Sequence, residues 1–254
     1  MTTPFPCILL QNRGNVKKFR RDFSPGGAVS LAGMGYPDGV PCPLCGAGPW
    51  QATLDTGKAG GFRPACHCSS CGLVFIHPSR LPDAGSERAR YLRHENNAAD
   101  PGYRAFLLRI VTLLEARGLL AGAGLDYGCG PVPVLAALLR ERGLSVAVYD
   151  PFFHPDRTVF DRKYGFILCT EAAEHFHRPG EEFARLAGLL APGGCLGLVT
   201  RLLDDVSCFP GWEYASDPTH VSFYGEATIR HLGGRFGWEA ERQGRDLVLF
   251  VKNR

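Results

Sequence analysis

The hydrophobic pattern divides the chain into a weakly patterned N-terminal part and a C-terminal part in which strands and helices alternate. After Pro101, one helix face is formed by the apolar residues Tyr103, Phe106, Leu107, Ile110, Val111 and Leu114. Strands are predicted at 124–127, 145–149, 166–170 and 195–200, with helices at 134–142, 182–190 and 226–236. An antiparallel pair, 238–243 and 247–252, closes the pattern. This order predicts an α/β fold, with a Rossmann-like, doubly wound, mostly parallel sheet covered by helices on both faces.

Length and composition narrow the class of protein. The 254 residues suffice for one α/β domain and a small module. Hydrophobic residues make up 45% and charged residues 21%, which excludes a wholly disordered or fibrous chain. No apolar run approaches the roughly 20 residues of a membrane span, and the apolar patch at 7–10 lacks the preceding basic residues of a secretory signal. We therefore expect a cytoplasmic protein without a membrane partner.

The distribution of charged residues, glycine, proline and cysteine along the chain predicts the domain boundaries. Residues 1–40 contain many Gly and Pro and no periodicity, which predicts a disordered tail, with Met34 as an alternative start. Residues 41–80 form a cysteine-rich module, 81–101 read as a linker, and 102–254 form the α/β domain. The tail carries five basic and two acidic residues, which accounts for the whole net charge of +3. The balanced remainder argues against a nucleic-acid partner without excluding one.

Five of the ten cysteines fall within the cysteine-rich module. Cys42 and Cys45, then Cys68 and Cys71, form two Cys-x-x-Cys-Gly turns, and the 22 residues between them leave room for a β-hairpin. Four thiolates on two such turns suit a structural, tetrahedral zinc ion, so the segment resembles a zinc ribbon. An iron site like that of rubredoxin is an alternative, and Cys66 and His67 are spare ligand candidates.

A glycine-rich turn follows the first predicted strand of the α/β domain. The motif Leu-Asp-Tyr-Gly-Cys-Gly-Pro, residues 125–131, lies between strand and helix, where a backbone without side chains can approach a ligand. Asp150 ends the next strand, 20 residues after Gly130, and is placed to accept hydrogen bonds from ribose hydroxyls. A dinucleotide-binding GxGxxG motif would need a third glycine where this chain has Pro133.

Residues 125–135, 148–150, 166–179 and 190–200 together resemble the successive motifs of class I S-adenosylmethionine-dependent methyltransferases. The resemblance covers roughly residues 100–254. More narrowly, the chain resembles bacterial enzymes grouped with the ubiquinone-pathway O-methyltransferases, some of which carry an N-terminal zinc ribbon. It implies that S-adenosylmethionine is the cofactor. The residues it implies for cofactor binding are Asp126, Gly128, Cys129 and Gly130 at the methionine end, Asp150 and Pro151 at the ribose, and Cys169 and Thr170 below the sulfonium.

The chain departs from this family in two places. Val132 stands where the family usually has glycine. Only 13 residues separate Asp150 from Tyr164, too few for a helix–strand–helix unit, so the third strand of the standard sheet is expected to be missing. The acidic residue that often contacts adenine would be lost with it, and we expect Phe152 and Phe153 to pack on the adenine instead.

A cluster of carboxylates and histidines follows the third predicted strand. Glu171, Glu174 and His175 would share one face of a helical turn, and His220 could join them from a later loop. Such a set suits magnesium, manganese or zinc, and it resembles the metal site of small-RNA 2′-O-methyltransferases. Alternatively, His175 or His220 acts as a general base without metal. Trp212 and Tyr214 are candidates for stacking on the acceptor, and Tyr91, His94 and Asn96 for closing over the cofactor.

These observations predict an enzyme that methylates a hydroxyl oxygen of a small molecule. Glu171, Glu174, His175 and His220 would organise and deprotonate the acceptor, with a divalent metal as a candidate second cofactor. One alternative is an RNA methyltransferase that grips its substrate with the zinc ribbon and the basic tail. Another is a non-catalytic interaction protein built on a degenerate methyltransferase fold. The sequence leaves the partner of the zinc ribbon open.

Overall fold

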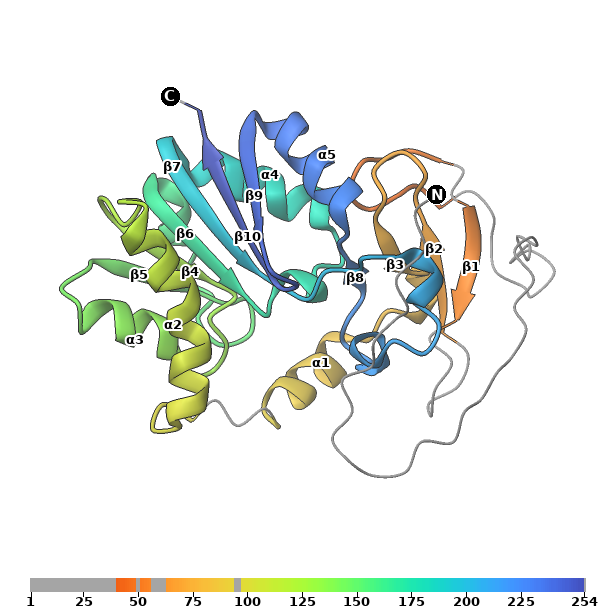
Figure 1. The fold of residues 1–254 in the computed structure, drawn as a ribbon. Coiled ribbons are helices and arrows are strands. Elements are labelled where there is room, and N and C mark those ends of the chain that lie inside the picture. Colours follow the sequence, from red (N-terminus) through yellow and green to blue (C-terminus); the bar gives the residue numbers. More distant parts are fainter. Residues whose placement is uncertain (1–39, 49–50, 56–62, 94–96, 254) are drawn as a thin grey trace.

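The chain forms two sheets that lie side by side (Figure 1). The computed structural model describes residues 40–48, 51–55, 63–93 and 97–253; the expected disordered tail, up to residue 39, lies outside them. The larger sheet has the strand order β5-β4-β6-β7-β10-β9, and the smaller has the order β1-β2-β3-β8. Over the described residues, no helix is long and apolar enough to cross a membrane.

The larger sheet confirms the predicted fold class. Its strands are β4 (Gly124–Tyr127), β5 (Val146–Tyr149), β6 (Tyr164–Thr170), β7 (Leu190–Val199), β9 (Trp238–Gln243) and β10 (Leu247–Lys252). The first four run parallel, and β10 runs antiparallel to both β7 and β9. Its helices are α2 (Pro101–Ala116), α3 (Val134–Arg140), α4 (Pro179–Leu189) and α5 (Glu226–Phe236).

Alternating side chains of the central strands build a core on each face of this sheet. In β6, Phe166 and Leu168 pack with α2 and α3, whereas Ile167 and Cys169 pack in the cluster that contains α4 and α5. Strand β10 alternates in the same way. The period of two along each strand therefore places one helix pair on each face.

The third strand of the standard sheet is absent, as predicted. Strand β5 is an edge strand, and the described residues 150–163 form a tight turn and a short 3-10 helix, η3 (Arg157–Asp161). Two backbone hydrogen bonds between Asp150 and His154, of 3.1 and 3.0 Å, close the turn. The chain therefore returns from the edge strand directly to β6.

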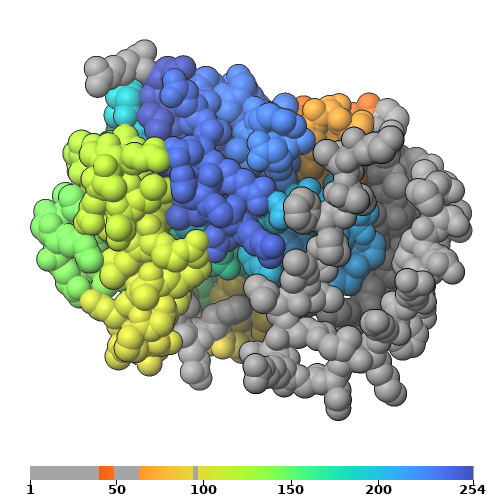
Figure 2. All heavy atoms as spheres, viewed as in Figure 1, coloured from red at the N-terminus to blue at the C-terminus, as the bar shows by residue number. Residues whose placement is uncertain are grey.

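The smaller sheet joins the cysteine module to the C-terminal part of the chain. It contains β1 (Gln51–Asp55), β2 (Pro64–His67), β3 (Val74–Ile76) and β8 (Ser222–Phe223), all antiparallel. The module also docks on the larger sheet's helices, because Pro43 O accepts from Gly180 N (3.0 Å) and Leu44 O accepts from the Arg235 guanidinium (2.5 Å). In the space-filling view, the C-terminal residues, coloured blue, lie between helices α2 and α3 and the module (Figure 2).

A short helix lies within the segment that was expected to be a linker. Helix α1 (Ala84–Tyr91) follows the 3-10 helix η2 (Pro78–Arg80) and is capped by Asp83, which accepts from Ser86 N at 2.9 Å. Its one buried residue is Glu87. Because α1 has no apolar stripe, hydrophobic periodicity cannot predict it.

Candidate functional site

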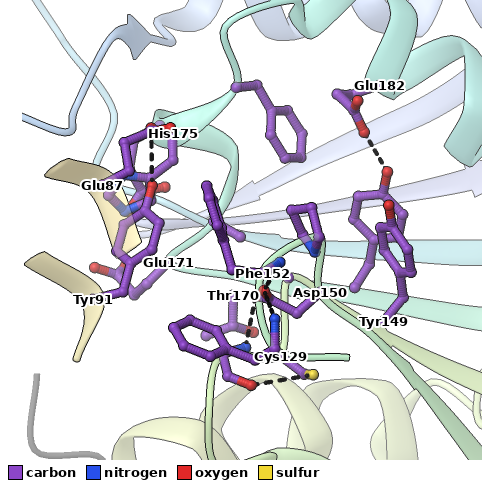
Figure 3. Close-up of a pocket in the computed structure, with 18 of the residues that line it drawn as sticks. Glu87, Tyr91, Cys129, Tyr149, Asp150, Phe152, Thr170, Glu171, His175 and Glu182 are labelled. Atoms are coloured by element: carbon purple, nitrogen blue, oxygen red, sulfur yellow. Dashed lines mark hydrogen bonds between the residues drawn. The ribbon is translucent and has the colours of Figure 1, made fainter. Parts of the chain in front are cut away.

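A cavity of about 640 Å³ lies at the carboxyl ends of β4, β5 and β6. Its lining includes the segments 128–131, 149–153, 170–172 and 174–178, which follow or end those three strands. Figure 3 shows Tyr91 and His175 toward one end of the cavity and Tyr149 and Glu182 toward the other. Ligands of α/β proteins bind at this edge of a parallel sheet.

The glycine-rich turn lies against the cavity, and its residues 128–131 line it. Gly128 has a φ of +77°, and a Cβ atom there would lie 2.4 Å from the Cβ of Ala172. Gly128 N and Cys129 N both donate to Tyr149 O, at 2.8 and 3.1 Å, which fixes the turn against the end of β5. Any larger residue at position 128 would therefore displace the segment after β6.

The Asp150 carboxylate organises two of the lining segments. Its Oδ2 accepts from Gly130 N at 3.0 Å, and its Oδ1 accepts from Phe152 N and Phe153 N at 2.8 and 3.1 Å. A carboxylate offers about four acceptor positions. These three bonds therefore leave room for one further donor, such as a ribose hydroxyl.

Two residues expected at the cofactor do not line this cavity. The Asp126 carboxylate lies behind the turn and accepts from Ala136 N at 3.1 Å; burial raises its pKa to about 7. Cys169 is wholly buried in the core of the sheet. By contrast, Cys129, Pro151 and Thr170 do line the cavity, and the buried Thr170 Oγ1 has no hydrogen-bond partner among the described residues.

Glu174, His175 and His220, here called the triad, bring three candidate ligand atoms within 4.8 Å of one another. Glu174 is wholly buried; its Oε1 accepts from the Tyr214 hydroxyl at 2.5 Å, while Oε2 has no partner in the described part of the chain.

The backbone fixes the tautomers of both histidines. His175 Nδ1 lies 2.9 Å from Thr219 O, and His220 Nδ1 lies 2.7 Å from Tyr214 O. Because a carbonyl oxygen only accepts, each Nδ1 must carry a hydrogen. In the neutral imidazoles, each Nε2 then keeps a free lone pair.

Glu171 does not belong to the triad, which corrects the expectation that four residues form one group. Glu171 has a φ of 48°, and it is the one non-glycine residue with positive φ in the described ranges. This left-handed turn precedes the 3-10 helix η4 (Ala173–His175), so the spacing rule for one helix face does not apply. The Glu171 side chain lines the cavity instead, where enclosure by the walls and the nearby Glu174 raise its pKa.

The aromatic residues expected around the acceptor lie in the core, whereas the one expected to close over the cofactor lies at the cavity. Trp212 and Tyr214 pack with Phe209 and Phe223 and do not line the cavity, because their segment folds onto the smaller sheet. Tyr91 does line it, and its ring lies edge-on to His175 at a centroid distance of 5.0 Å. His94 and Asn96 lie outside the described residues.

Glu87 is a cavity residue that sequence reasoning missed. It is 6% exposed, accepts from the Tyr91 hydroxyl at 3.2 Å and pairs with His177 Nε2 at 3.0 Å. Its position depends on α1, for which the sequence offered only the Asp83 cap as a signal.

The four cysteines of the two turns also converge. The Sγ atoms of Cys42, Cys45, Cys68 and Cys71 lie within 4.8 Å of one another. Cys42 to Cys71 and Cys45 to Cys68 are each 3.6 Å apart, close to the edge of about 3.8 Å that a tetrahedron with Zn–S bonds of about 2.3 Å requires. The hydrogen bond from Cys71 lowers the pKa of Cys42 to about 5.

Both turns have the same local geometry. Gly46 N donates to Cys42 O at 2.9 Å, Gly72 N donates to Cys68 O at 2.8 Å, and both glycines have a φ near +75° (76° and 74°). The spare candidates Cys66 and His67 are not in the converging group, and burial raises the pKa of Cys66 to about 12.

Comparison of the sequence with known protein families shows to which class of protein the chain belongs. The sequence profile of the family described as "Methyltransferase domain" matches residues 92–243, which include the glycine-rich turn, Asp150 and the triad. The chain belongs to this methyltransferase family. It is therefore an S-adenosylmethionine-dependent methyltransferase, and the alternative of a non-catalytic interaction protein is set aside.

Solved methyltransferase structures are similar to this methyltransferase at low sequence identity. Magnesium protoporphyrin IX methyltransferase from Synechocystis PCC 6803, solved with bound SAH, is 18% identical, with 67% of this chain and 95% of that chain covered and a TM-score of 0.46. The 1,6-didemethyltoxoflavin-N1-methyltransferase from Burkholderia thailandensis is 16% identical, with 74% and 99% covered and a TM-score of 0.46. An O-methyltransferase family protein from the same organism is 16% identical, with 65% and 66% covered and a TM-score of 0.43. No curated protein matches the sequence.

The buried Asp126 of the methyltransferase predicts a pH-dependent stability. Its pKa is about 7 when folded, against an ordinary value of 3.8, so the folded state holds a proton that the unfolded state releases. This stabilisation is present below about pH 4 and is lost as the pH rises through about 7. Relative to Asp126→Asn, the wild-type free energy of unfolding should fall by at most about 4 kcal/mol between these pH values.

Urea unfolding of the wild type and of Asp126→Asn across this pH range gives the difference between their free energies of unfolding. The contributions of the other titrating groups are the same in both proteins and cancel in this difference. A difference that stays constant with pH would contradict the raised pKa.

Proposed function

We propose that this methyltransferase methylates a hydroxyl oxygen of a small molecule, and that Glu174, His175 and His220 hold a divalent metal ion beside the acceptor. The observation that carries the proposal is the triad's set of free acceptor atoms. Glu174 Oε2 has no partner over the described residues, and the hydrogen bonds at Nδ1 leave both Nε2 lone pairs free. A hydroxyl acceptor is also what the resemblance to ubiquinone-pathway O-methyltransferases implies.

The donor set fits a transition metal better than magnesium. Two imidazole nitrogens and one carboxylate oxygen suit manganese, iron or zinc, whereas magnesium prefers oxygen ligands. Metal-binding histidines usually donate their second ring N–H to a carbonyl or carboxylate, as both histidines do here. A cation would also compensate the buried Glu174 charge, which is costly when unpaired.

The chemistry is a direct displacement at the methyl carbon. The acceptor oxygen forms a bond to that carbon, the carbon–sulfur bond breaks, and its electron pair returns to sulfur to give S-adenosylhomocysteine. The hydroxyl proton must leave in the same process. A bound divalent ion would lower the pKa of the hydroxyl it contacts. Glu171, the carboxylate beside the triad that is open to the cavity, is the group we assign to accept the proton.

The other lining residues suit S-adenosylmethionine. The backbone of the glycine-rich turn fits the methionine end, and the remaining acceptor position of Asp150 fits a ribose hydroxyl. Thr170, Phe152 and Phe153 also line the cavity. We assign the two phenylalanine rings to the adenine.

We further propose that residues 41–80 form a zinc ribbon in which Cys42, Cys45, Cys68 and Cys71 bind a structural zinc ion. The spacing of the sulfur atoms and the shared turn geometry support this assignment. A module of this size gains much of its folding free energy from the metal.

Replacing Asp150 tests the cofactor site. In Asp150→Ala, the affinity for S-adenosylmethionine should fall about 10- to 100-fold, since a hydrogen bond to a charged group contributes about 1.5–3 kcal/mol. Titration calorimetry gives the dissociation constants. Asp156→Ala, which removes an exposed carboxylate from the same connection, should bind like the wild type. Equal affinities for all three proteins would contradict the assigned role of Asp150.

Manganese binding tests the triad. The wild type should bind Mn²⁺, measured as the loss of the free-ion electron paramagnetic resonance signal, whereas Glu174→Gln and His220→Ala should bind at least about 10-fold more weakly. Glu171→Gln is the matched control and should keep the wild-type affinity, because Glu171 lies outside the triad. A wild type that binds no Mn²⁺ would overturn the metal site and favour the alternative in which His175 or His220 acts as the general base without metal.

Cobalt substitution tests the zinc ribbon separately from the triad. Cobalt-loaded protein should show thiolate-to-cobalt charge-transfer absorption, which a site of nitrogen and oxygen ligands does not give. Cys68→Ser should weaken this absorption strongly. Cys66→Ser should keep it, because Cys66 is not one of the four converging thiols. The proposal fails if the two variants behave alike.

A further inference from the structure

One short segment supports all three members of the triad. This segment, residues 214–220, donates from the Tyr214 hydroxyl to Glu174 and accepts from His220 Nδ1 at Tyr214 O. It also accepts from His175 Nδ1 at Thr219 O. The orientation of each candidate ligand atom therefore depends on where this segment lies.

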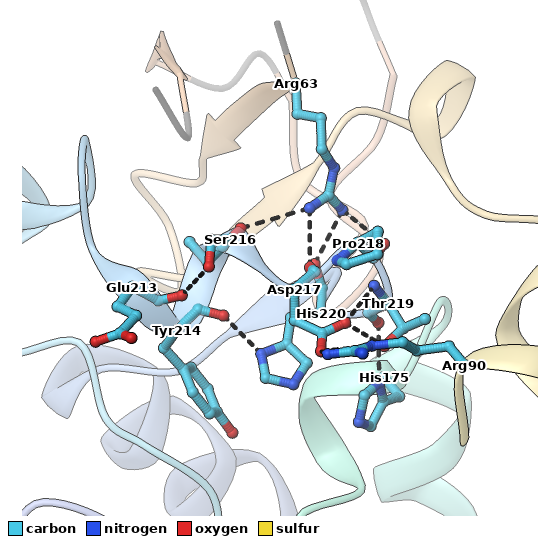
Figure 4. A network of polar contacts seen from close by, with 11 residues as sticks. Arg63, Arg90, His175, Glu213, Tyr214, Ser216, Asp217, Pro218, Thr219 and His220 are labelled. Atoms are coloured by element: carbon cyan, nitrogen blue, oxygen red, sulfur yellow. Dashed lines mark hydrogen bonds and ion pairs between the residues drawn. The ribbon is translucent and has the colours of Figure 1, made fainter. Parts of the chain in front are cut away.

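Arg63, from the cysteine module, holds the same segment from the other side. Its guanidinium donates to the backbone oxygens of Asp217 and Pro218, each at 3.0 Å, and of His220 at 3.1 Å, with a longer contact of 3.4 Å to Ala215 O (Figure 4). A guanidinium is planar and its donors point in fixed directions. The carbonyl groups must therefore converge on one plane, which restricts the path of the segment.

A second link connects the module to the residue after the segment. Val221 N donates to Glu174 O at 2.8 Å, and Val221 O accepts from Ile76 N at 2.9 Å. Ile76 ends β3, and β8 pairs with β3 immediately after Val221. The smaller sheet is thus bonded through Val221 to the backbone of a triad residue.

Helix α1 holds the segment at a third point. The Arg90 guanidinium pairs with Asp217 Oδ2 at 2.6 Å, and Asp217 Oδ1 accepts from the Thr219 hydroxyl at 2.7 Å. Burial opposes the charge of Asp217, yet these bonds hold its pKa below the ordinary value. This contact orients the side chains of the segment, whereas Arg63 fixes its backbone.

We infer that the cysteine module is a positioning element of the active site, and that Arg63 is a positioning residue that acts through the segment 214–220 on His175 and His220. The inference rests on the proposed function, since it assigns how the triad is held. The cysteine cluster is turned inward: Cys42 and Cys71 are 2% and 1% exposed and pack in the same core as α4 and α5. The described part of the module therefore serves the catalytic domain by holding this segment.

Replacing Arg63 should disturb the triad and spare the cofactor. In Arg63→Ala, Mn²⁺ affinity should fall about 10- to 100-fold, as for other residues that orient metal ligands. S-adenosylmethionine affinity should stay within about twofold of the wild type, because these four bonds of Arg63 run to the segment 214–220 and the cofactor is assigned to the glycine-rich turn and Asp150. Added ethylguanidinium should restore part of the Mn²⁺ affinity, and Arg63→Lys, which keeps one donor group, should show an intermediate loss.

Histidine side-chain ¹⁵N NMR of the metal-free protein supplies a readout that does not depend on metal. In the wild type, His175 and His220 should both show the Nδ1–H tautomer. In Arg63→Ala, and more weakly in Arg63→Lys, the population of this tautomer should fall. Arg235→Ala is the matched control: it removes another arginine between module and domain, but one that donates to Leu44 O far from the segment. It should change neither tautomers nor Mn²⁺ affinity.

The outcomes separate the two proposals. Unchanged tautomers and unchanged Mn²⁺ affinity in Arg63→Ala would overturn the positioning role, as would equal losses in Arg63→Ala and Arg235→Ala. A wild type without Mn²⁺ binding would overturn the metal function alone. In that case, a tautomer change confined to the Arg63 variants would still support the positioning role, and its absence would end it.

Discussion

The buried carboxylate of Glu174 imposes the requirement that most of the site meets. It is wholly buried, and a buried carboxylate without compensation costs several kcal/mol. Tyr214 satisfies one oxygen, the other has no partner among the described residues, and two histidine ring nitrogens with free lone pairs lie within 4.8 Å of a Glu174 carboxylate oxygen. Three acceptors that converge without a donor repel one another. The cation that we propose would resolve that repulsion.

Meeting this requirement forces two distant parts of the chain together. Glu174 and His175 directly follow β6, whereas His220 lies more than 40 residues later. A long loop between them could adopt many conformations, and holding its ends together costs conformational entropy. The smaller sheet limits this freedom through the β3–β8 pairing, the Val221 hydrogen bonds and Arg63. The two sheets therefore share one site, although the sequence suggests two separate units.

Local signals explain which elements could be predicted from the sequence. The strands 124–127, 238–243 and 247–252 and the helix 226–236 agree to the residue with the structure, because periodicity and turn residues mark both of their ends. Gly237, for example, ends α5 with a φ of 66°. The two cysteine turns could likewise be found, since each depends on a glycine directly after its second cysteine.

The remaining features depend on tertiary contacts that no local pattern encodes. Helix α1 buries only Glu87, so its sequence has no apolar stripe from which the helix could be predicted. The left-handed turn at Glu171 removes that residue from the triad, although its spacing suits a helix face. Tyr214 supports Glu174 from the core of the smaller sheet, and its packing could be inferred only once that sheet was known.

The truncated sheet brings α1 between the turn held by Asp150 and the triad, which we assign to the cofactor and to the acceptor. Because the chain turns back after β5, Phe152 and Phe153 lie at a tight turn and contact α1, through Tyr91 at 5.6 Å and Arg88 at 5.6 Å. The same Tyr91 ring lies against His175. One side chain thus touches both the turn held by Asp150 and the triad. Methyl transfer needs the reacting atoms to approach to about 3–3.5 Å, so the separation of these two regions must be fixed closely. Under the proposed function, the short polar helix α1, held by the Glu87–His177 and Arg90–Asp217 pairs, would fix that separation.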